Sequence, residues 1–161
     1  MFKSYLVSEA RAEYHKKQKD PKNGCEFCEY YKNGSALFAT KLSFGVVNTY
    51  PYSTGHIMVL PIRHVKDVRE LADEELKDMM DCGKKLLDLI EKVYHMHSFN
   101  MGMNIGQGSG GSVEHLHLHI VPRAVGDSGF LESTSSTRIL KESPQDTVKK
   151  LKKAIQDLGG F

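Results

Sequence analysis

The residues best suited to chemistry in this chain are three histidines that alternate with large aliphatic residues. His115, His117 and His119 are separated by Leu116 and Leu118. Strict period-two alternation predicts a β-strand that turns the three imidazoles toward one face and the aliphatic side chains toward the core. Packing does not explain three histidines on one face, because histidine is only intermediate in its tendency to be buried. We therefore predict that this strand carries a functional site.

A glycine-rich loop, residues 106–112, leads directly into the histidine strand. Glycine lets the backbone turn tightly and brings successive N–H groups close to a ligand, and such concavities bind anions, above all phosphate. Ser112 adds a hydroxyl three residues before His115. A flexible hairpin loop is the plainer interpretation of the glycines alone, but the adjoining histidines favour a phosphate site.

A neutral histidine beside a bound phosphate can attack phosphorus and form a covalent intermediate. His117 has a histidine on either side, His115 and His119, and is the predicted nucleophile. His119 is expected to donate to the phosphate, while Ser112 and the loop N–H groups complete the cradle for its oxygens. A catalytic zinc held by the three histidines is the competing hypothesis. It is disfavoured because Glu114, the only carboxylate next to the triad, points to the opposite face.

A second group of residues suits a structural metal. Cys25 and Cys28 form a Cys-x-x-Cys pair, which is half of a zinc site. Structural zinc takes four nitrogen or sulfur ligands, and His64 and His115 are available as further donors. A thioredoxin-like redox role is disfavoured because no strand–helix unit frames the pair. The three cysteines make no disulfide framework, and Cys82 is interpreted as a small buried hydrophobic residue on a helix.

The composition is that of an ordinary globular domain. The chain has 161 residues, of which 26% are charged and 40% hydrophobic, and its net charge is +2. Such a charge alone neither favours nor excludes a nucleic-acid or membrane partner, and no other feature suggests one, so we expect neither. An apolar run of about 18 residues and a signal-peptide core are both lacking. We expect one cytoplasmic domain over residues 1–161.

The elements that must position the site are predicted from periodicity and turn residues. Besides the histidine strand, strands are expected at residues 36–40, 42–48, 56–61 and 100–105. The last of these forms a hairpin with the histidine strand. Cys25 to Cys28 are expected on a loop, and residues 126–144 on a polar arm. Helices are expected at residues 4–19, 73–94 and 147–158.

The helix at 73–94 should begin at Asp73 as its N-cap. Its apolar stripe is predicted to consist of Leu76, Met79, Met80, Gly83, Leu87, Ile90 and Tyr94. The predicted fold class is α+β, a mostly antiparallel β-sheet packed with one long and one or two shorter helices.

The stretch from His115 to Val121 resembles the signature of the histidine-triad (HIT) family, and residues 111–113 are similar to its phosphate loop. Residues 42–51 and 55–61 are similar to the family's ribose-binding strand and its partner. The resemblance runs from about residue 25 to residue 123 and leaves a C-terminal arm and helix at 124–161. It is closest to the Fhit and dinucleoside polyphosphate phosphorylase branches. Histidine rather than glutamine at the third triad position disfavours the uridylyltransferase branch.

The resemblance implies a HIT-like fold and an enzyme that cleaves at the α-phosphate of (di)nucleoside polyphosphates or nucleoside phosphoramidates. The expected intermediate is a nucleotidyl group on His117, and the expected partner is a purine nucleotide or a dinucleoside polyphosphate. Water and phosphate are both acceptors for this intermediate, so hydrolase and phosphorylase stay equally open. A nucleotide-binding or signalling module with vestigial catalysis is the alternative function, and a zinc hydrolase is a third.

The resemblance also implies roles for individual residues. It places Asn48 on the ribose and His56 behind the triad as support. Its phosphate contacts are Asn104, Gly111, Ser112, Val113 and His119, and its base pocket includes Phe27 and Val46. Its zinc ligands are Cys25, Cys28, His64 and His115. Finally, it implies a homodimer with the long helix near the interface.

Overall fold

The computed structural model describes residues 24–111, 113–125, 127 and 140–161. The predicted helix at 4–19, Ser112 and most of the predicted arm at 126–144 lie outside the described residues.

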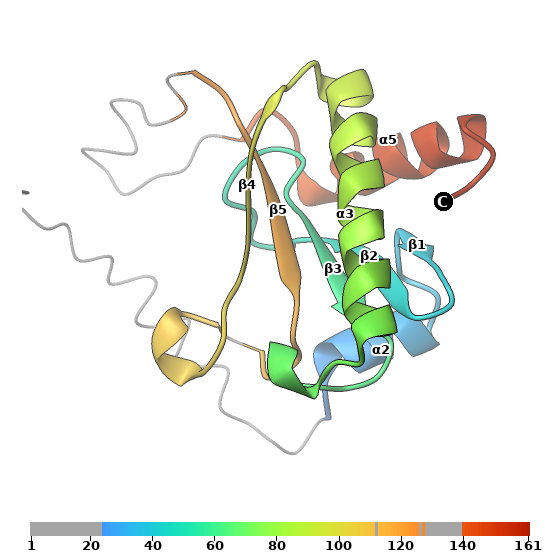
Figure 1. The fold of residues 1–161 in the computed structure, drawn as a ribbon. Coiled ribbons are helices and arrows are strands. Elements are labelled where there is room, and N and C mark those ends of the chain that lie inside the picture. Colours follow the sequence, from blue (N-terminus) through green and yellow to red (C-terminus); the bar gives the residue numbers. More distant parts are fainter. Residues whose placement is uncertain (1–23, 112, 126, 128–139) are drawn as a thin grey trace, which may run out of the picture.

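A five-stranded antiparallel sheet forms the centre of the protein (Figure 1). Its strands are β1 (Phe38–Ala39), β2 (Ser43–Val47), β3 (Ile57–Pro61), β4 (Ser98–Met103) and β5 (Leu118–Arg123). They lie in the order β1-β2-β3-β5-β4, so the last strand in the sequence is inserted between β3 and β4. The predicted hairpin is confirmed as β4 and β5, which enclose the glycine-rich loop between them.

Helices cover both faces of this sheet. The long helix α3 (Asp73–Tyr94) crosses one face, and α5 (Pro144–Asp157) packs beside it (Figure 1). The short helix α2 (Glu26–Lys32) packs on the other face through Phe27. Within the described residues no helix combines the length and the apolar character that crossing a membrane requires. The α+β prediction is confirmed.

Alternation along the strands divides the core into two clusters. Ile57 and Val59 of β3 pack under α3, whereas Met58 and Leu60 pack toward α2. His119 of β5 pairs with Met58, and directly paired residues in an antiparallel sheet point to the same face. The imidazole of His119 therefore lies on the α2 side of the sheet. The predicted burial of the aliphatic residues in the triad stretch is confirmed, because Leu116, Leu118 and Ile120 are all buried.

The histidine strand begins later than predicted. β5 starts at Leu118, so His115 and His117 precede it. The reason is that the chain before Leu118 pairs with a loop and not with β3, since the Leu116 N–H donates to the Val65 carbonyl at 2.7 Å. The three imidazoles nevertheless lie on the α2 side of the sheet, as predicted, because Phe27 meets the rings of His115 and His117, and the ring of His117 meets that of His119.

The segment after Cys25 is helical, so the prediction of a loop at Cys25 to Cys28 was wrong. Helix α2 starts at Glu26 with Cys25 at its N-cap, and Phe27 is the one residue of the helix that is fully buried. A helix of seven residues with a single buried side chain has no apolar periodicity to detect.

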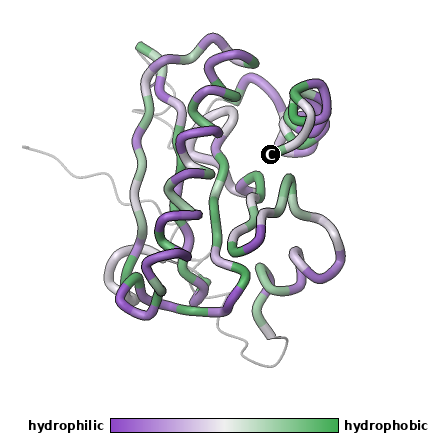
Figure 2. The backbone as a smooth tube through the Cα atoms, turned by 45° about the vertical axis from the view of Figure 1, so that its right-hand side comes forward, coloured by the Kyte–Doolittle hydropathy of each residue, from purple (hydrophilic) through white to green (hydrophobic). Residues whose placement is uncertain are grey.

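The predicted boundaries of α3 are confirmed, but its buried stripe is shifted. Met80 is 38% exposed, and Leu86 and Leu89 take buried positions instead. Figure 2 shows hydrophilic and hydrophobic residues alternating along this helix, as expected for an element with one buried side. Asp73 is not the N-cap, because Ala72 occupies that position in an extended conformation.

The other elements also differ from the prediction at their ends. β1, β2 and β3 are shorter than the predicted strands at 36–40, 42–48 and 56–61. β4 covers residues 98–103 rather than 100–105, because Ser98 pairs with Arg123 at the far end of β5. α5 begins at Pro144 and not at residue 147, because the Ser143 hydroxyl accepts a hydrogen bond from the Asp146 N–H at 3.1 Å. A serine followed by proline is a helix-start signal that the sequence does contain.

Candidate active site and adjoining metal centre

The centre of the site is a buried contact between two histidines. His56 lies just before β3, and its Nε2 is 2.9 Å from Nδ1 of His119 in β5. Tyr52 stacks on His56 with ring centroids 5.0 Å apart, which covers the pair from one side. The structure therefore brings together His56 and His119, as predicted, and adds Tyr52, which the sequence did not single out.

The hydrogen bonds of His56 determine where the protons lie. The backbone N–H of Tyr52 donates to Nδ1 of His56 at 3.0 Å, so that nitrogen carries no proton. The proton of neutral His56 must be on Nε2, from which it donates to Nδ1 of His119. His119 is then protonated on Nε2. That nitrogen is buried and has no hydrogen-bond partner in the described part of the chain, so its N–H is a free donor inside the protein.

His117 has the opposite tautomer from that of His119. Its Nδ1 lies 2.7 Å from the carbonyl oxygen of His115, and because a carbonyl only accepts, the proton is on Nδ1. The lone pair is therefore on Nε2. The rings of His117 and His119 are 4.6 Å apart between centroids and nearly perpendicular. A nucleophilic nitrogen and an unpaired N–H donor thus belong to adjacent rings.

Burial keeps these histidines neutral. Desolvation lowers the pKa of His119 from 6.5 to about 4, and that of His115 also to about 4. Burial lowers the pKa of His117 as well. An imidazole must be neutral to offer a lone pair, so the environment favours the reactive form of His117 at physiological pH.

Phe27 and Val46, the residues proposed for a base pocket, are in the core. Phe27 is only 6% exposed and Val46 only 4% exposed, and both belong to the cluster on the α2 side of the sheet. The ring of Phe27 meets that of His117 edge-on at 5.4 Å between centroids. Phe27 therefore supports the imidazole of His117 directly, while its role in binding a base stays a prediction.

Asn48, predicted to bind the ribose, lies beside His56. Its Nδ2 is 3.4 Å from Nδ1 of His56, and its Oδ1 accepts from the N–H of Tyr50 at 2.9 Å. The two upstream residues that the family resemblance selects are therefore neighbours in space, on the turn between β2 and β3.

The glycine-rich loop is folded and not extended. Gly106 and Gly110 adopt positive φ angles of 78° and 86°, which only glycine takes up easily, on either side of the one-turn 3-10 helix η3 (Gln107–Ser109). Gly111 packs on Asn104, where an added Cβ would lie 3.4 Å from the Asn104 Cβ. Two predicted phosphate contacts are thus side by side, and Val113 packs against the core cluster of Phe27.

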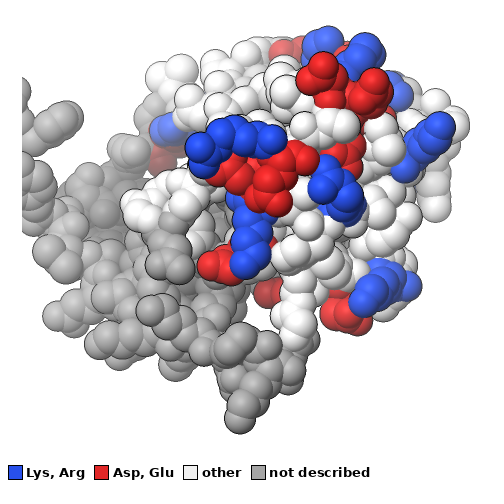
Figure 3. Space-filling model, turned by 60° about the horizontal axis from the view of Figure 1, so that its bottom comes forward, with Lys and Arg blue, Asp and Glu red and all other residues white. Residues whose placement is uncertain are grey.

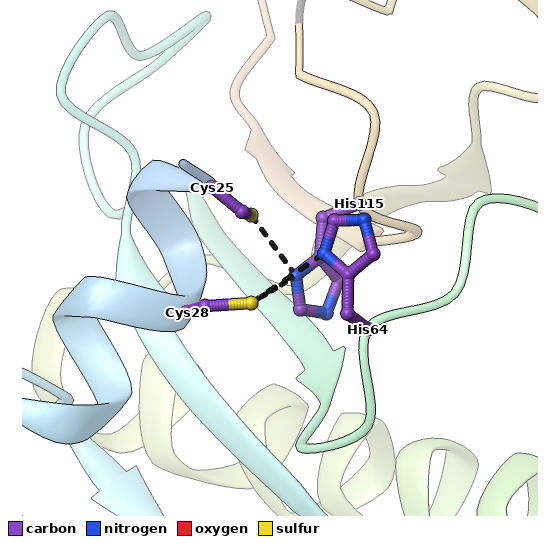
Figure 4. Close-up of side chains that lie close together, drawn as sticks. All are labelled: Cys25, Cys28, His64 and His115. Atoms are coloured by element: carbon purple, nitrogen blue, oxygen red, sulfur yellow. Dashed lines mark hydrogen bonds between the residues drawn. The ribbon is translucent and has the colours of Figure 1, made fainter. Parts of the chain in front are cut away.

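The predicted metal ligands converge on one point. Cys25, Cys28, His64 and His115 each offer a ligand atom, and these four atoms lie within 4.8 Å of one another. Figure 4 shows Cys25, at the N-cap of α2, and Cys28, in the helix, facing the two imidazoles. Sγ of Cys25 is 3.4 Å from Nδ1 of His115, and Sγ of Cys28 is 3.4 Å from Nδ1 of His64.

The chemistry of this donor set fits zinc. Nε2 of His115 lies 2.9 Å from the carbonyl oxygen of Pro61, so its proton is on Nε2 and its Nδ1 lone pair faces the sulfurs. Metal-binding histidines characteristically donate their second N–H to a carbonyl or carboxylate in this way. Burial and the neighbouring Cys25 raise the pKa of Cys28 to about 11, so a bound cation is needed to hold this sulfur as a thiolate. Two sulfurs and two imidazoles match a structural zinc site.

Charged residues surround the start of α3. Ion pairs join Arg63 to Glu75 and Lys66 to Glu114, at 2.7 Å and 2.5 Å. Figure 3 shows basic and acidic side chains next to one another on this end of the molecule. The Glu114 side chain is exposed, and its partner Lys66 helps to hold the segment that leads into His115.

The sequence analysis did not single out the backbone groups that orient the histidines. Three tautomers are fixed by backbone groups: that of His56 by the N–H of Tyr52, that of His115 by the carbonyl oxygen of Pro61, and that of His117 by the carbonyl oxygen of His115. Backbone groups have no residue signature, so only the folded structure could reveal them.

Comparison with known proteins agrees with this geometry. The family model described as "HIT domain" matches residues 31–126. The chain is 38% identical over 117 residues to the AP-4-A phosphorylase of Mycobacterium tuberculosis, a match that covers 72% of this chain and 60% of that protein. It is 33% identical over 92 residues to the bis(5'-adenosyl)-triphosphatase of Dictyostelium discoideum, covering 57% of this chain and 62% of that one. The chain thus spans about three fifths of the length of these curated relatives.

The fold is shared with solved structures. A Zn-bound histidine triad family protein from Mycobacterium smegmatis superimposes with a TM-score of 0.69 and 24% sequence identity, covering 84% of this chain and 96% of that chain. The family match extends over more than half of the chain and includes all three histidines of the triad. The chain therefore belongs to the HIT domain family.

Proposed function

We propose that the chain is an enzyme that cleaves (di)nucleoside polyphosphates or nucleoside phosphoramidates at the α-phosphate. The observation that carries this proposal is that two complementary groups lie on adjacent rings. His117 has a lone pair on Nε2, and His119 has an Nε2–H without a hydrogen-bond partner among the described residues. A buried donor without a partner costs free energy, which a phosphoryl oxygen accepting that hydrogen bond would recover. The names of the relatives, a phosphorylase and a triphosphatase of dinucleoside polyphosphates, support the substrate class.

In the first step Nε2 of His117 attacks the α-phosphorus. A new P–N bond to His117 forms, and in a polyphosphate the P–O bond to the leaving group breaks, with its electron pair departing on oxygen. In a phosphoramidate the P–N bond to the leaving amine breaks instead, and that nitrogen takes a proton from solvent as it leaves. The His117 ring gains positive charge, so its Nδ1–H bond to the His115 carbonyl becomes charge-assisted and stronger. His119 donates its Nε2–H to a phosphoryl oxygen and stabilises the charge that develops there.

In the second step an acceptor oxygen attacks phosphorus and the P–N bond breaks, which restores neutral His117. Water as acceptor gives hydrolysis, and inorganic phosphate gives phosphorolysis. The 38% identity to a phosphorylase favours phosphorolysis as the second candidate activity.

The substrate is proposed to extend from the histidines in two directions. Asn48 would bind the ribose, because it lies beside His56 on the β2–β3 turn. Asn104 and Gly111 would contact phosphate from the glycine-rich loop, where they pack on each other. Ser112 and Val113 are proposed to complete these contacts.

Intact-mass spectrometry after brief incubation with diadenosine polyphosphates, quenched at alkaline pH, tests the proposal. A nucleotidyl mass on the wild type, absent from His117→Ala, would establish the nucleophile. His97→Ala is the matched control, because His97 is an exposed histidine whose Nδ1 lies 3.6 Å from Glu91. A diphosphate product that requires added phosphate would identify a phosphorylase. Nucleotide binding without adduct or turnover would contradict the proposal and favour a binding module.

The four-ligand cluster is proposed to hold a structural zinc through Cys25, Cys28, His64 and His115. The ion would supply positive charge to the two thiolates and join α2 to the segment that carries the nucleophile. The solved Zn-bound relative supports this proposal. Elemental analysis of the purified protein, compared with Cys28→Ser, would measure the zinc content directly.

A homodimer through β4 is also proposed. β4 is an end strand of the sheet, with Met101 on it 38% exposed. Gly83 of α3 approaches Met101, since an added Cβ there would lie 3.0 Å from its methyl group, so β4 and α3 share one surface. An unpaired strand edge with exposed apolar residues suits pairing with a second copy. Light scattering of Met101→Lys against the wild type tests this, and an unchanged mass would contradict it.

A further inference from the structure

Cys25 and Cys28 are linked to the proposed nucleophile by three contacts. Nδ1 of His115 lies 3.4 Å from Sγ of Cys25 and 3.6 Å from Sγ of Cys28. The carbonyl oxygen of the same His115 accepts the Nδ1–H of His117 at 2.7 Å. Phe27, which lies between the two cysteines in the sequence, meets His117 edge-on. A movement of the two sulfurs therefore changes the surroundings of His115 and Phe27, the two residues that contact the ring of His117.

The pair is placed where a small oxidant can reach it. Cys25 and Cys28 are both partly exposed, whereas Cys82 of α3 is buried in the core. The ligand atoms of the cluster, both sulfurs included, are within 4.8 Å of one another. A disulfide needs an S–S distance of about 2.05 Å, so the two sulfurs must move closer together. A shift of the first turn of the short helix α2 can bring them into contact. The fold thus offers one accessible pair and a protected third cysteine.

We propose that Cys25 and Cys28 form a peroxide-sensitive site, whose oxidation to a disulfide displaces His117 and switches the enzyme off. In this step the two thiols lose two electrons and two protons, an S–S bond forms, and one peroxide is reduced to two waters. Any zinc bound by the sulfurs leaves as the free ion, with its two thiolates supplying the electrons and solvent the protons. The effect on catalysis rests on the proposed function, whereas the oxidation itself does not.

The consequence for the active site follows from the same contacts. The disulfide withdraws both sulfurs from Nδ1 of His115, so its ring keeps only the bond to Pro61. Closing the S–S bond also moves the first turn of α2, and with it the ring of Phe27. The His115 carbonyl, which accepts from His117, and the ring of Phe27, which contacts His117, are then both displaced. This role differs from that of a thioredoxin-like enzyme, because the pair acts on its own chain.

The test uses the purified zinc-loaded protein treated with hydrogen peroxide. Alkylation under denaturing conditions followed by intact-mass spectrometry counts free thiols, and a chromogenic chelator measures released zinc. The ¹⁵N signals of the His117 imidazole report its environment, and nucleotidyl-adduct formation reports activity. Cys28→Ser removes the pair, and Cys82→Ser is the matched control that keeps it.

We expect the wild type and Cys82→Ser to lose two alkylatable thiols and release zinc together. The His117 signals should shift, and adduct formation should slow at least about tenfold, as when a supporting contact of a ligand is lost. A reductant with added zinc should restore every readout. The proposal is overturned if both thiols stay free, or if the disulfide forms while the His117 signals stay unchanged. If the reduced protein forms no adduct, the proposed function is wrong. The ¹⁵N signals of His117 still show whether disulfide formation displaces its ring.

Discussion

Nε2 of His56 donates to Nδ1 of His119 across 2.9 Å in the interior of the protein, and this bond ends a chain that starts at a backbone amide. The N–H of Tyr52 cannot lose its proton at any physiological pH. It therefore fixes the tautomer of His56, which in turn fixes that of His119. The proton on Nε2 of His119 is thus positioned by a group that does not titrate.

His56→Ala should slow nucleotidyl transfer about tenfold or more, because His119 then loses the donor that keeps its proton on Nε2. The ¹⁵N spectrum of His119 should change from one tautomer to a mixture, which loss of packing alone would not produce. Rapid-quench mass spectrometry measures the rate. His97→Ala serves as the control, and an unchanged tautomer in His56→Ala would contradict the assignment.

Stability should fall as the pH is lowered from neutral toward about 4. Burial lowers the pKa of His119 from 6.5 to about 4, so between these values the unfolded chain binds a proton that the folded chain does not. The contribution of His119 to the free energy of unfolding therefore decreases as the pH falls through 6.5 and stops changing near 4. Urea titrations should show a shallower decrease in His119→Gln, since His115 and His117 still contribute. Equal slopes in the two proteins would show that His119 is not responsible.

Removal of the proposed zinc should destabilise the protein and disturb His117. A chelator, or the substitution His64→Ala, should lower Tm and reduce bound zinc, because the four ligands join α2 to the segment before β5. Differential scanning calorimetry with and without chelator measures the effect. His64→Ala should lose most of its response to chelator, and a chelator effect as large as in the wild type would place the metal elsewhere.

Gly45→Ala should destabilise the fold by about 1–3 kcal/mol through overpacking. A Cβ on Gly45 would lie 2.1 Å from the ring of Phe38, and that ring is stacked on Phe161 at 3.7 Å between centroids. Gly102→Ala is the matched control on β4, where an added Cβ meets nothing within 4 Å. Chemical denaturation compares them. The cost should shrink in a Phe38→Ala background, and equal costs in both backgrounds would exclude the clash.

The sequence predicts the fold well where periodicity is long. The helix at 73–94 was predicted with its correct bounds because 22 residues repeat the helical period several times. Helix α2 was missed because its seven residues bury only Phe27. The start of β5 was misplaced because alternation continues through His115 and His117, although their backbone pairs with a loop.

The candidate site was predictable by residue type but not by geometry. Cys25, Cys28, His64 and His115 were named as ligands from their chemistry, and the structure brings their donor atoms together. The tautomers were not predictable, because they depend on backbone groups of Tyr52, Pro61 and His115. No pattern of side chains encodes these positions.

The position of β5 in the sheet has a consequence for folding. Within the described sheet, β4 is hydrogen-bonded to β5 and to no other strand. Because β5 follows β4 in the sequence, residues 98–103 are synthesised before the strand with which they pair. β5 must then enter between β3 and β4, a pairing of distant segments that makes folding slow. Completing the sheet and setting His119 against His56 are thus one event. A nascent chain that stops before Leu118 has neither a complete sheet nor the His56–His119 contact of the candidate site.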